Sequence, residues 1–122
     1  MYTIKKVIYF SAAHFLRNYK GKCESLHGHN WKVEVVVSKS KLDDAGMVMD
    51  FGDLKSLTVG VLNNLDHKNL NDIEYFKKYN PSSENIAKYI FDELKSSITE
   101  RGCQLEEIKV WETESSCAVY SE

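Results

Sequence analysis

The sequence predicts an α+β fold in which two helices cover one face of an antiparallel four-stranded sheet. Segments with the two-residue alternation of a strand lie near both ends of the chain, and segments with helical spacing of apolar residues lie between them. The predicted order is therefore strand, strand, helix, helix, strand, strand, which is typical of helices packed on one face of a sheet. The chain has 122 residues and no repeat or linker, so one domain over residues 1–122 is expected.

The strand predictions rest on β-branched and aromatic side chains that alternate with polar ones. In the first strand the apolar phase changes at Lys5 and Lys6. This change predicts a β-bulge there, or burial of both faces beyond Val7. Four segments are predicted as strands: residues 2–10, 31–38, 105–111 and 117–120.

The two predicted helices occupy the middle of the chain. Asp50 or Asp53 can cap the first helix. Its apolar residues recur at helical spacing: Leu54, Leu57, Val61, Leu62 and Leu65. The second helix has a strong start signal in residues 80–84, Asn-Pro-Ser-Ser-Glu, where a serine can cap the helix and an acid follows in its first turn. Arg101 and Gly102 are expected to end it.

Composition excludes several classes of function. Hydrophobic residues make up 43% of the chain and charged residues 28%, as in ordinary globular proteins. The net charge of −2 gives no support to a general role on nucleic acids or membrane surfaces. No apolar run approaches the ~20 residues of a membrane span. The N-terminal residues begin a strand-like alternation and do not resemble a signal peptide.

The three cysteines are Cys23, Cys103 and Cys117. An odd number of cysteines without a secretion signal favours free thiols in a reducing compartment, so a cytoplasmic location is expected. Cys103 and Cys117 are interpreted as packing residues. Cys23 differs from them because it lies close to two histidines.

Residues 22–30, Lys-Cys-Glu-Ser-Leu-His-Gly-His-Asn, place one thiol and two imidazoles close together. His27 and His29 are two residues apart, so on an extended backbone both side chains point to the same face. They continue the phase of the apolar residues that begin at Trp31, which predicts that both point inward. A single buried histidine is often only a hydrogen-bonded core residue, but an inward pair favours a metal site.

His14, at the end of the first strand, can complete a set of three imidazole ligands, because neighbouring antiparallel strands bring it beside the second strand. Catalytic zinc sites typically have three protein ligands and one open position. Three imidazoles also leave the ion its full charge, which suits activation of a bound hydroxyl. A closed structural site with Cys23 as fourth ligand is the alternative, although no second cysteine pair gives it a zinc-finger spacing.

Two further places carry candidate catalytic groups. Asp66 and His67 follow the first helix, and a carboxylate, an imidazole and a thiol together can form a proton-transfer device. Adjacent side chains seldom hydrogen-bond to each other, so a surface pair without function is the alternative. Glu112 ends the third predicted strand, where its carboxylate can accept two hydrogen bonds from a ring edge. An exposed acid in a turn is the alternative there.

Taken together, these motifs resemble the 6-pyruvoyltetrahydropterin synthase family, and within it the branch that makes 6-carboxy-5,6,7,8-tetrahydropterin for queuosine biosynthesis. The resemblance covers nearly the whole chain, and its motifs occur in the same order as in the family. The matching segments are Phe10–His14, Cys23–Asn30, Asp50–Lys55, Leu65–Asn71, Asn80–Asn85 and Trp111–Thr113.

The resemblance implies the tunnelling fold, in which subunits join their sheets edge to edge into a barrel, usually as a homo-hexamer built from two trimers. Open sheet edges are then satisfied by neighbouring subunits. It also implies active sites between subunits, so the loop with Cys23 and the loop with Asp66 and His67 are expected to come from different chains in one site.

The implied reaction converts 7,8-dihydroneopterin 3′-triphosphate to 6-carboxy-5,6,7,8-tetrahydropterin, acetaldehyde and triphosphate. By the resemblance, one Zn²⁺ per subunit is held by His14, His27 and His29. Cys23 would be the general base, and a thiol needs nearby positive charge to lower its pKa for this work. The resemblance also implies a proton relay formed by Asp66, His67 and Glu112. Glu112 would in addition anchor the pterin, and Ser82 and Ser83 would line the substrate pocket.

The spacing of three residues between Cys23 and His27 favours the 6-carboxy product, because synthases of the 6-pyruvoyl product generally have a longer interval. Glu24 points to another alternative, since Glu-x-x-His-Gly-His resembles relatives that cleave the side chain to 6-hydroxymethyl dihydropterin for folate. A non-enzymatic alternative is a zinc-stabilised binding module in which Cys23 closes the metal site. That alternative leaves Asp66, His67 and Glu112 without a role.

Overall fold

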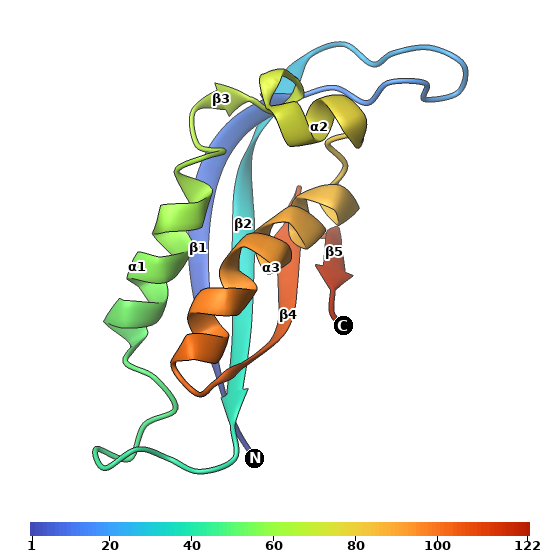
Figure 1. The fold of residues 1–122 in the computed structure, drawn as a ribbon. Helices are drawn as coiled ribbons and strands as arrows, with labels where there is room; N and C mark the ends of the chain where they lie inside the picture. Colours follow the sequence, from blue (N-terminus) through green and yellow to red (C-terminus); the bar gives the residue numbers. More distant parts are fainter.

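The computed structural model describes every residue from Met1 to Glu122. It contains a five-stranded sheet in the order β3-β1-β2-β4-β5, and α1 and α3 lie against one face of this sheet (Figure 1). All neighbouring strands are antiparallel except β1 and β3. The elements in chain order are β1 (Tyr2–His14), β2 (His27–Lys39), α1 (Phe51–Leu62), β3 (Lys68–Asn69), the 3-10 turn η1 (Leu70–Asp72), α2 (Glu74–Lys78), α3 (Ser83–Glu100), β4 (Gln104–Trp111) and β5 (Cys117–Tyr120).

The predicted α+β class and helix placement are confirmed, but the prediction of four antiparallel strands is wrong in number. The additional strand, β3, has only two residues and pairs in parallel with Ala12 and Ala13 of β1. The additional helix, α2, has five residues. Segments this short contain too few residues to show a strand or helix period, so their sequence carries no detectable signal.

The predicted bulge in β1 is also wrong. β1 pairs with β2 in an unbroken register from Tyr2–Lys39 to His14–His27. The even residues of β1 face the helices, and the phase change arises because Val7 and Tyr9 are apolar residues on the exposed opposite face. The irregularity in the sheet lies between β2 and β4 instead, at residues 36 and 37 of β2.

The core lies between the sheet and the two longer helices. The inward residues of β2 and the apolar face of α3 form its centre, and each of these side chains is fully buried: Trp31, Val33, Val35, Val37, Ile86, Ile90 and Ile98. Leu54 and Leu62 of α1 are buried as predicted, whereas Leu65 is buried just beyond the end of the helix. None of the helices is both long and apolar enough to cross a membrane.

The helix ends follow the predicted signals. The Asp50 side chain accepts a hydrogen bond from the Asp53 amide at the start of α1, and Ser82 accepts one from the Asn85 amide at the start of α3. After α3 the chain turns at Gly102, whose φ of +71° is the left-handed conformation that glycine adopts easily. Cys103 is buried as predicted, but Cys117 is exposed because β5 is an edge strand of the sheet.

Candidate metal centre

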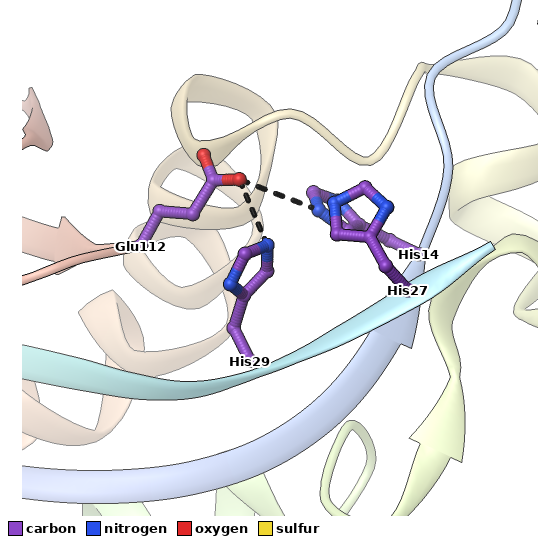
Figure 2. Close-up of side chains that lie close together, drawn as sticks. All are labelled: His14, His27, His29 and Glu112. Carbon is purple, nitrogen blue, oxygen red and sulfur yellow. Dashed lines mark ion pairs between the residues drawn. The ribbon is translucent and has the colours of Figure 1, made fainter. Parts of the chain in front are cut away.

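Three histidines converge at the end of the β1–β2 pair. His14 and His27 are register partners, and His29 lies two residues further along β2, so all three point to the helix-covered face. The ring centroids are 4.7 Å apart for His14 and His27, 5.2 Å for His14 and His29, and 4.9 Å for His27 and His29. Strand pairing, a long-range feature of the fold, thus gathers three imidazoles into one place (Figure 2).

Backbone carbonyl groups orient two of these rings. Nδ1 of His14 lies 2.7 Å from the Pro81 carbonyl oxygen, and Nδ1 of His27 lies 2.8 Å from that of Ser25. A carbonyl oxygen only accepts hydrogen bonds, so each Nδ1 is the protonated nitrogen and donates. The lone pair of each ring is therefore on Nε2, the arrangement that outer-shell partners impose on metal-binding histidines.

Glu112, directly after β4, approaches the same point from the opposite side (Figure 2). Its Oε1 lies 2.9 Å from Nε2 of His29 and 3.6 Å from Nε2 of His14. Its Oε2 accepts a hydrogen bond of 3.3 Å from the Ser83 hydroxyl at the start of α3. The ligand atoms of the three histidines and Glu112 all lie within 4.8 Å of one another, so these residues can hold one metal ion.

The unsatisfied nitrogen atoms of the centre fit a cation. Nε2 of His14 and Nε2 of His29 are buried and have no hydrogen-bond partner, although Glu112 lies close to both. Buried polar atoms without partners are uncommon and costly, and a metal ion would satisfy both. Three imidazole nitrogens and a carboxylate oxygen are ligand types that zinc accepts.

The protonation of His29 also suits metal binding. Burial lowers the pKa of His29, because it disfavours the charged ring, while Glu112 raises it. The neighbouring His14 and His27 lower the pKa further by repulsion between charges. The His29 ring therefore stays neutral down to a lower pH than the ring of an ordinary histidine. The neutral imidazole is the form that binds metals.

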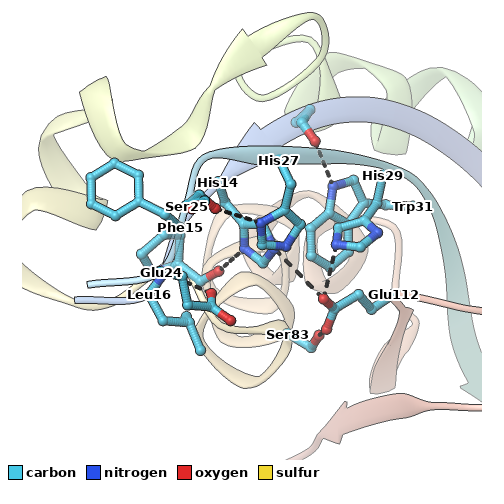
Figure 3. A network of polar contacts seen from close by, with 12 residues as sticks. His14, Phe15, Leu16, Glu24, Ser25, His27, His29, Trp31, Ser83 and Glu112 are labelled. Atoms are coloured by element: carbon cyan, nitrogen blue, oxygen red, sulfur yellow. Dashed lines mark hydrogen bonds and ion pairs between the residues drawn. The ribbon is translucent and has the colours of Figure 1, made fainter. Parts of the chain in front are cut away.

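Trp31 forms the inner wall of the centre. Its side chain is fully buried, and its indole ring meets the rings of His14 and His29 edge to face, with centroid distances of 4.9 and 5.1 Å. Its Nε1 donates a hydrogen bond of 3.2 Å to the Ala12 carbonyl oxygen (Figure 3). These contacts hold the imidazoles against rigid neighbours.

Cys23 lies in the loop between β1 and β2 and is exposed. It is not among the residues whose ligand atoms cluster; the fourth member of that group is Glu112. The loop is nevertheless connected to the centre, because the Ser25 carbonyl accepts the hydrogen bond of His27. Glu24 also contacts Leu16, which follows His14 by two residues (Figure 3).

Asp66 and His67 lie at the edge of β1 on the opposite, helix-free face of the sheet. Asp66 Oδ1 accepts a hydrogen bond of 2.9 Å from the Ser11 amide, which lowers the pKa of Asp66. The same oxygen lies 3.0 Å from Nδ1 of His67, so these adjacent side chains do interact. With Tyr9 and Asn30 they line a surface pocket of about 450 Å³.

His67 has a left-handed backbone, with φ +58°, and its side chain is 82% exposed. This conformation is uncommon for residues other than glycine and is found often at functional sites. Within one chain, however, the sheet separates His67 from the three-histidine centre.

The two predicted pocket serines have different positions. The Ser82 side chain is used as the cap of α3, whereas the Ser83 hydroxyl contacts Glu112. The sequence does not predict the proximity of Glu112 to the imidazole nitrogens. It depends on where β4 ends relative to α3, and no local sequence pattern encodes that position.

The chain is similar to known proteins over its whole length. The family model described as 6-pyruvoyl tetrahydropterin synthase matches residues 3–122. A putative 6-carboxy-5,6,7,8-tetrahydropterin synthase of Archaeoglobus fulgidus is 44% identical over 110 residues, covering 89% of this chain and 86% of the relative. The 6-carboxy-5,6,7,8-tetrahydropterin synthase of Synechocystis is 41% identical, covering 98% of this chain and 93% of the relative.

Relatives with another product name are similar to a comparable degree. The human 6-pyruvoyl tetrahydrobiopterin synthase is 39% identical, covering 96% of this chain and 89% of the relative. Among solved structures, that of Caenorhabditis elegans 6-pyruvoyl tetrahydropterin synthase superposes with a TM-score of 0.85 at 33% identity, covering 99% of this chain and 95% of that one.

Proposed function

Because the chain belongs to the 6-pyruvoyl tetrahydropterin synthase family and is an enzyme of that family, we propose that it is a 6-carboxy-5,6,7,8-tetrahydropterin synthase. The reaction converts 7,8-dihydroneopterin 3′-triphosphate and one water molecule to the 6-carboxy pterin, acetaldehyde and triphosphate, as a step of queuosine biosynthesis. The observation that carries the proposal is the three-imidazole centre with a thiol, Cys23, which three residues separate from the first β2 histidine, His27. A relative named as a putative enzyme with this product is 44% identical to the chain.

His14, His27 and His29 are proposed to hold one Zn²⁺ through their Nε2 atoms. When bound, zinc supplies a Lewis acid that lowers the pKa of a coordinated side-chain hydroxyl. The unpartnered Nε2 atoms of His14 and His29 support this assignment. Glu112 lies within ligand reach of the same point, and its carboxylate is also proposed to anchor the amino-pyrimidinone edge of the pterin.

Cys23 is proposed as the general base that moves protons at the substrate side chain. Its side chain is exposed, which leaves the thiol accessible to a bound substrate. Asp66 and His67 are proposed to relay protons to and from this thiol, with Asp66 orienting the imidazole through the 3.0 Å contact. Ser83 is proposed to hold Glu112 in place, and Ser82 to shape the pocket beside it.

A complete site of this kind needs two chains. Asp66 and His67 lie on the helix-free face, and the metal centre lies on the helix-covered face. We propose that His67 of one subunit meets Cys23 of another in a homo-oligomer, with a hexamer of two trimers as the expected assembly. The outer edges of β5 and of most of β1 are free to pair with neighbouring strands.

Residues 1–122 are proposed to form one domain that acts in the cytoplasm on a small-molecule substrate, without nucleic acid or membrane partners. The three cysteines support a reducing compartment, because none of them forms a disulfide.

The identity of the carbon fragment tests the product assignment. The zinc-loaded protein is incubated with 7,8-dihydroneopterin triphosphate, and acetaldehyde and triphosphate are measured. Equal release of both supports the 6-carboxy product. Triphosphate without an aldehyde would indicate the 6-pyruvoyl product, and a glycolaldehyde-type fragment would indicate 6-hydroxymethyl dihydropterin. Cys23→Ala is the matched variant: retained zinc with lost turnover supports the enzyme, whereas lost zinc supports a thiol-closed binding module.

A further inference from the structure

The loop of residues 15–26 projects beyond the end of the sheet, and its first arm is held firmly to the rest of the protein (Figure 1). The Asn71 side chain accepts a hydrogen bond from the Phe15 amide and donates one to the Phe15 carbonyl, both 2.9 Å. The Asn80 side chain does the same for Arg17, at 2.9 and 2.8 Å. Two asparagine side chains thus replace a neighbouring strand for this arm.

The second arm, which carries Cys23, is held in a different way. The Glu24 amide donates a hydrogen bond of 2.9 Å to the Leu16 carbonyl, and Glu24 Oε1 accepts one of 3.0 Å from the Leu16 amide (Figure 3). The other hydrogen bonds of residues 22–26 stay local: the Lys22 amide donates to the Tyr19 carbonyl within the loop, and the Ser25 carbonyl accepts from Nδ1 of the nearby His27. The two bonds to Leu16 therefore join the Cys23 arm to the anchored arm.

The tip between the two arms cannot replace this connection. Asn18, Lys20 and Gly21 have φ values of +59°, +52° and +81°. Such left-handed residues make a compact turn but fix no contact with the body of the protein. Without the pair of bonds to Leu16, the position of the second arm would depend on this exposed turn alone.

We propose that Glu24 is a positioning residue for Cys23, acting as a clamp between the two arms of the loop. The inference rests on the proposed role of Cys23 as the base. One carboxylate oxygen of Glu24 accepts the hydrogen bond of the Leu16 amide, so in the clamp the side chain serves as a hydrogen-bond acceptor. A glutamine side chain presents the same amide-type acceptor without charge or basicity.

The clamp also acts on the metal centre. Ser25 follows Glu24 directly, and its carbonyl oxygen accepts the hydrogen bond from Nδ1 of His27. The position of Glu24 therefore determines the position of the Cys23 thiol before it and of the Ser25 carbonyl after it, which orients His27. Glu24 in this role supports Cys23 chemistry and hence the 6-carboxy product.

Three variants separate positioning from chemistry: Glu24→Gln, Glu24→Ala and, as control, Glu74→Ala, an exposed glutamate of α2 that has only a surface ion pair with Lys77. All are made with Cys117→Ser, so that Cys23 is the only exposed thiol. The one remaining cysteine, Cys103, is buried. Each is measured at saturating zinc for trypsin cleavage at Lys20 and Lys22, for the pH profile of Cys23 alkylation, and for kcat and KM.

For Glu24→Ala we expect trypsin cleavage of the loop to be about tenfold faster, as loss of one charge-assisted hydrogen bond implies. We also expect a shifted pH profile of alkylation and a kcat at least about tenfold lower. Glu24→Gln should restore all three to within about threefold of the parent protein, because the acceptor is kept. Glu74→Ala should change none of them.

Two results would overturn the proposal. If Glu24→Gln loses turnover while its trypsin and alkylation rates equal those of the parent, the carboxylate itself takes part in the chemistry. If Glu24→Ala leaves both of these rates unchanged, the clamp does not position the arm. Because neither rate depends on turnover, they decide the proposal even if the pterin substrate is not converted.

Discussion

The three histidines proposed as metal ligands differ in what orients their rings. Carbonyl groups outside the sheet fix the rings of His14 and His27, whereas His29 is opposed by the carboxylate of Glu112. Fixed tautomers prepare the nitrogen lone pairs before any ion arrives. The side chains therefore lose their conformational entropy when the protein folds. Less entropy is lost when the ion binds, which raises the metal affinity.

His27→Ala should abolish stoichiometric zinc binding. It removes a ligand, so the loss of affinity should exceed the about 10–100-fold that follows loss of an outer-shell partner. Elemental analysis after dialysis against a weak chelator measures the effect. His67→Ala is the control, because its exposed ring lies on the other face and should leave the zinc content unchanged. Equal zinc loss in both variants would contradict the assignment of ligands.

Asp66→Asn should lower the free energy of unfolding near neutral pH but not in acid. The Ser11 amide lowers the folded-state pKa of Asp66 below its ordinary value of 3.8. The ionised group therefore stabilises the fold above that value, and the contribution is lost as the pH falls through the folded-state pKa.

Urea unfolding of both proteins at about pH 6 and about pH 3 measures this dependence. Their difference should shrink at the lower pH. Asp44→Asn, a change of an exposed aspartate, is the control and should show no such convergence. A difference that is constant with pH would mean that the charge of Asp66 does not contribute.

For single residues, the sequence predicted positions on strands better than it predicted contacts between residues that are distant in the chain. The proximity of His27 and His29 follows from the strand period, and that of His14 from pairing of neighbouring strands. The approach of Glu112 and the clamp by Glu24 could not be predicted. Both depend on contacts between side chains and groups in separate segments of the chain, and a local sequence pattern does not predict such contacts.

The N-terminus of α3 forms part of the wall of the metal centre. Pro81 provides the carbonyl for His14, Ser82 caps the helix, and Ser83 contacts Glu112. Three consecutive residues therefore connect the start of one helix to both sides of the centre. The long elements were predictable because their periods extend over many residues, whereas β3 and α2 are too short to show a period. β3 pairs with β1, and the rings of Tyr75 and Phe76 in α2 pack against Tyr89 of α3.

Ser82→Ala and Ser83→Ala should separate stability from function at this helix end. Loss of the cap in Ser82→Ala should lower the free energy of unfolding by about 1 kcal/mol, as is usual for N-cap serines. Ser83→Ala should leave stability nearly unchanged and raise KM, because Glu112 loses its hydroxyl partner. Chemical denaturation and steady-state kinetics measure the two effects. An equal loss of stability in both variants would contradict this division.

Across the whole molecule, the sheet has two faces with different chemistry. The helix-covered face ends in the metal centre, and the exposed face carries the Asp66–His67 pair. The exposed face also contains Glu34, whose carboxylate is nearly buried among the amino groups of Lys5, Lys32 and Lys109 at 3.5 to 3.9 Å.

Mixed assemblies of two inactive variants should recover activity. Cys23→Ala and His67→Ala each remove one half of the proposed shared site. If the halves come from different chains, co-expression in equal amounts should leave about a quarter of the sites intact. Turnover of the purified mixture relative to the parent measures this fraction. Absence of recovery, with mixed assembly verified by differently tagged subunits, would place both halves in one chain.

The paired arms of the loop have a consequence for protein engineering. The bonds to Asn71, Asn80 and Leu16 all lie on the sheet side of the Lys20–Gly21 turn, so a peptide grafted into that turn leaves them in place. Doubling the length of a flexible loop costs only about 0.6 kcal/mol in closure entropy. We expect a short epitope tag inserted there to preserve zinc content and turnover, measured beside the untagged protein, and so to provide a handle for immobilising the enzyme beside its active site.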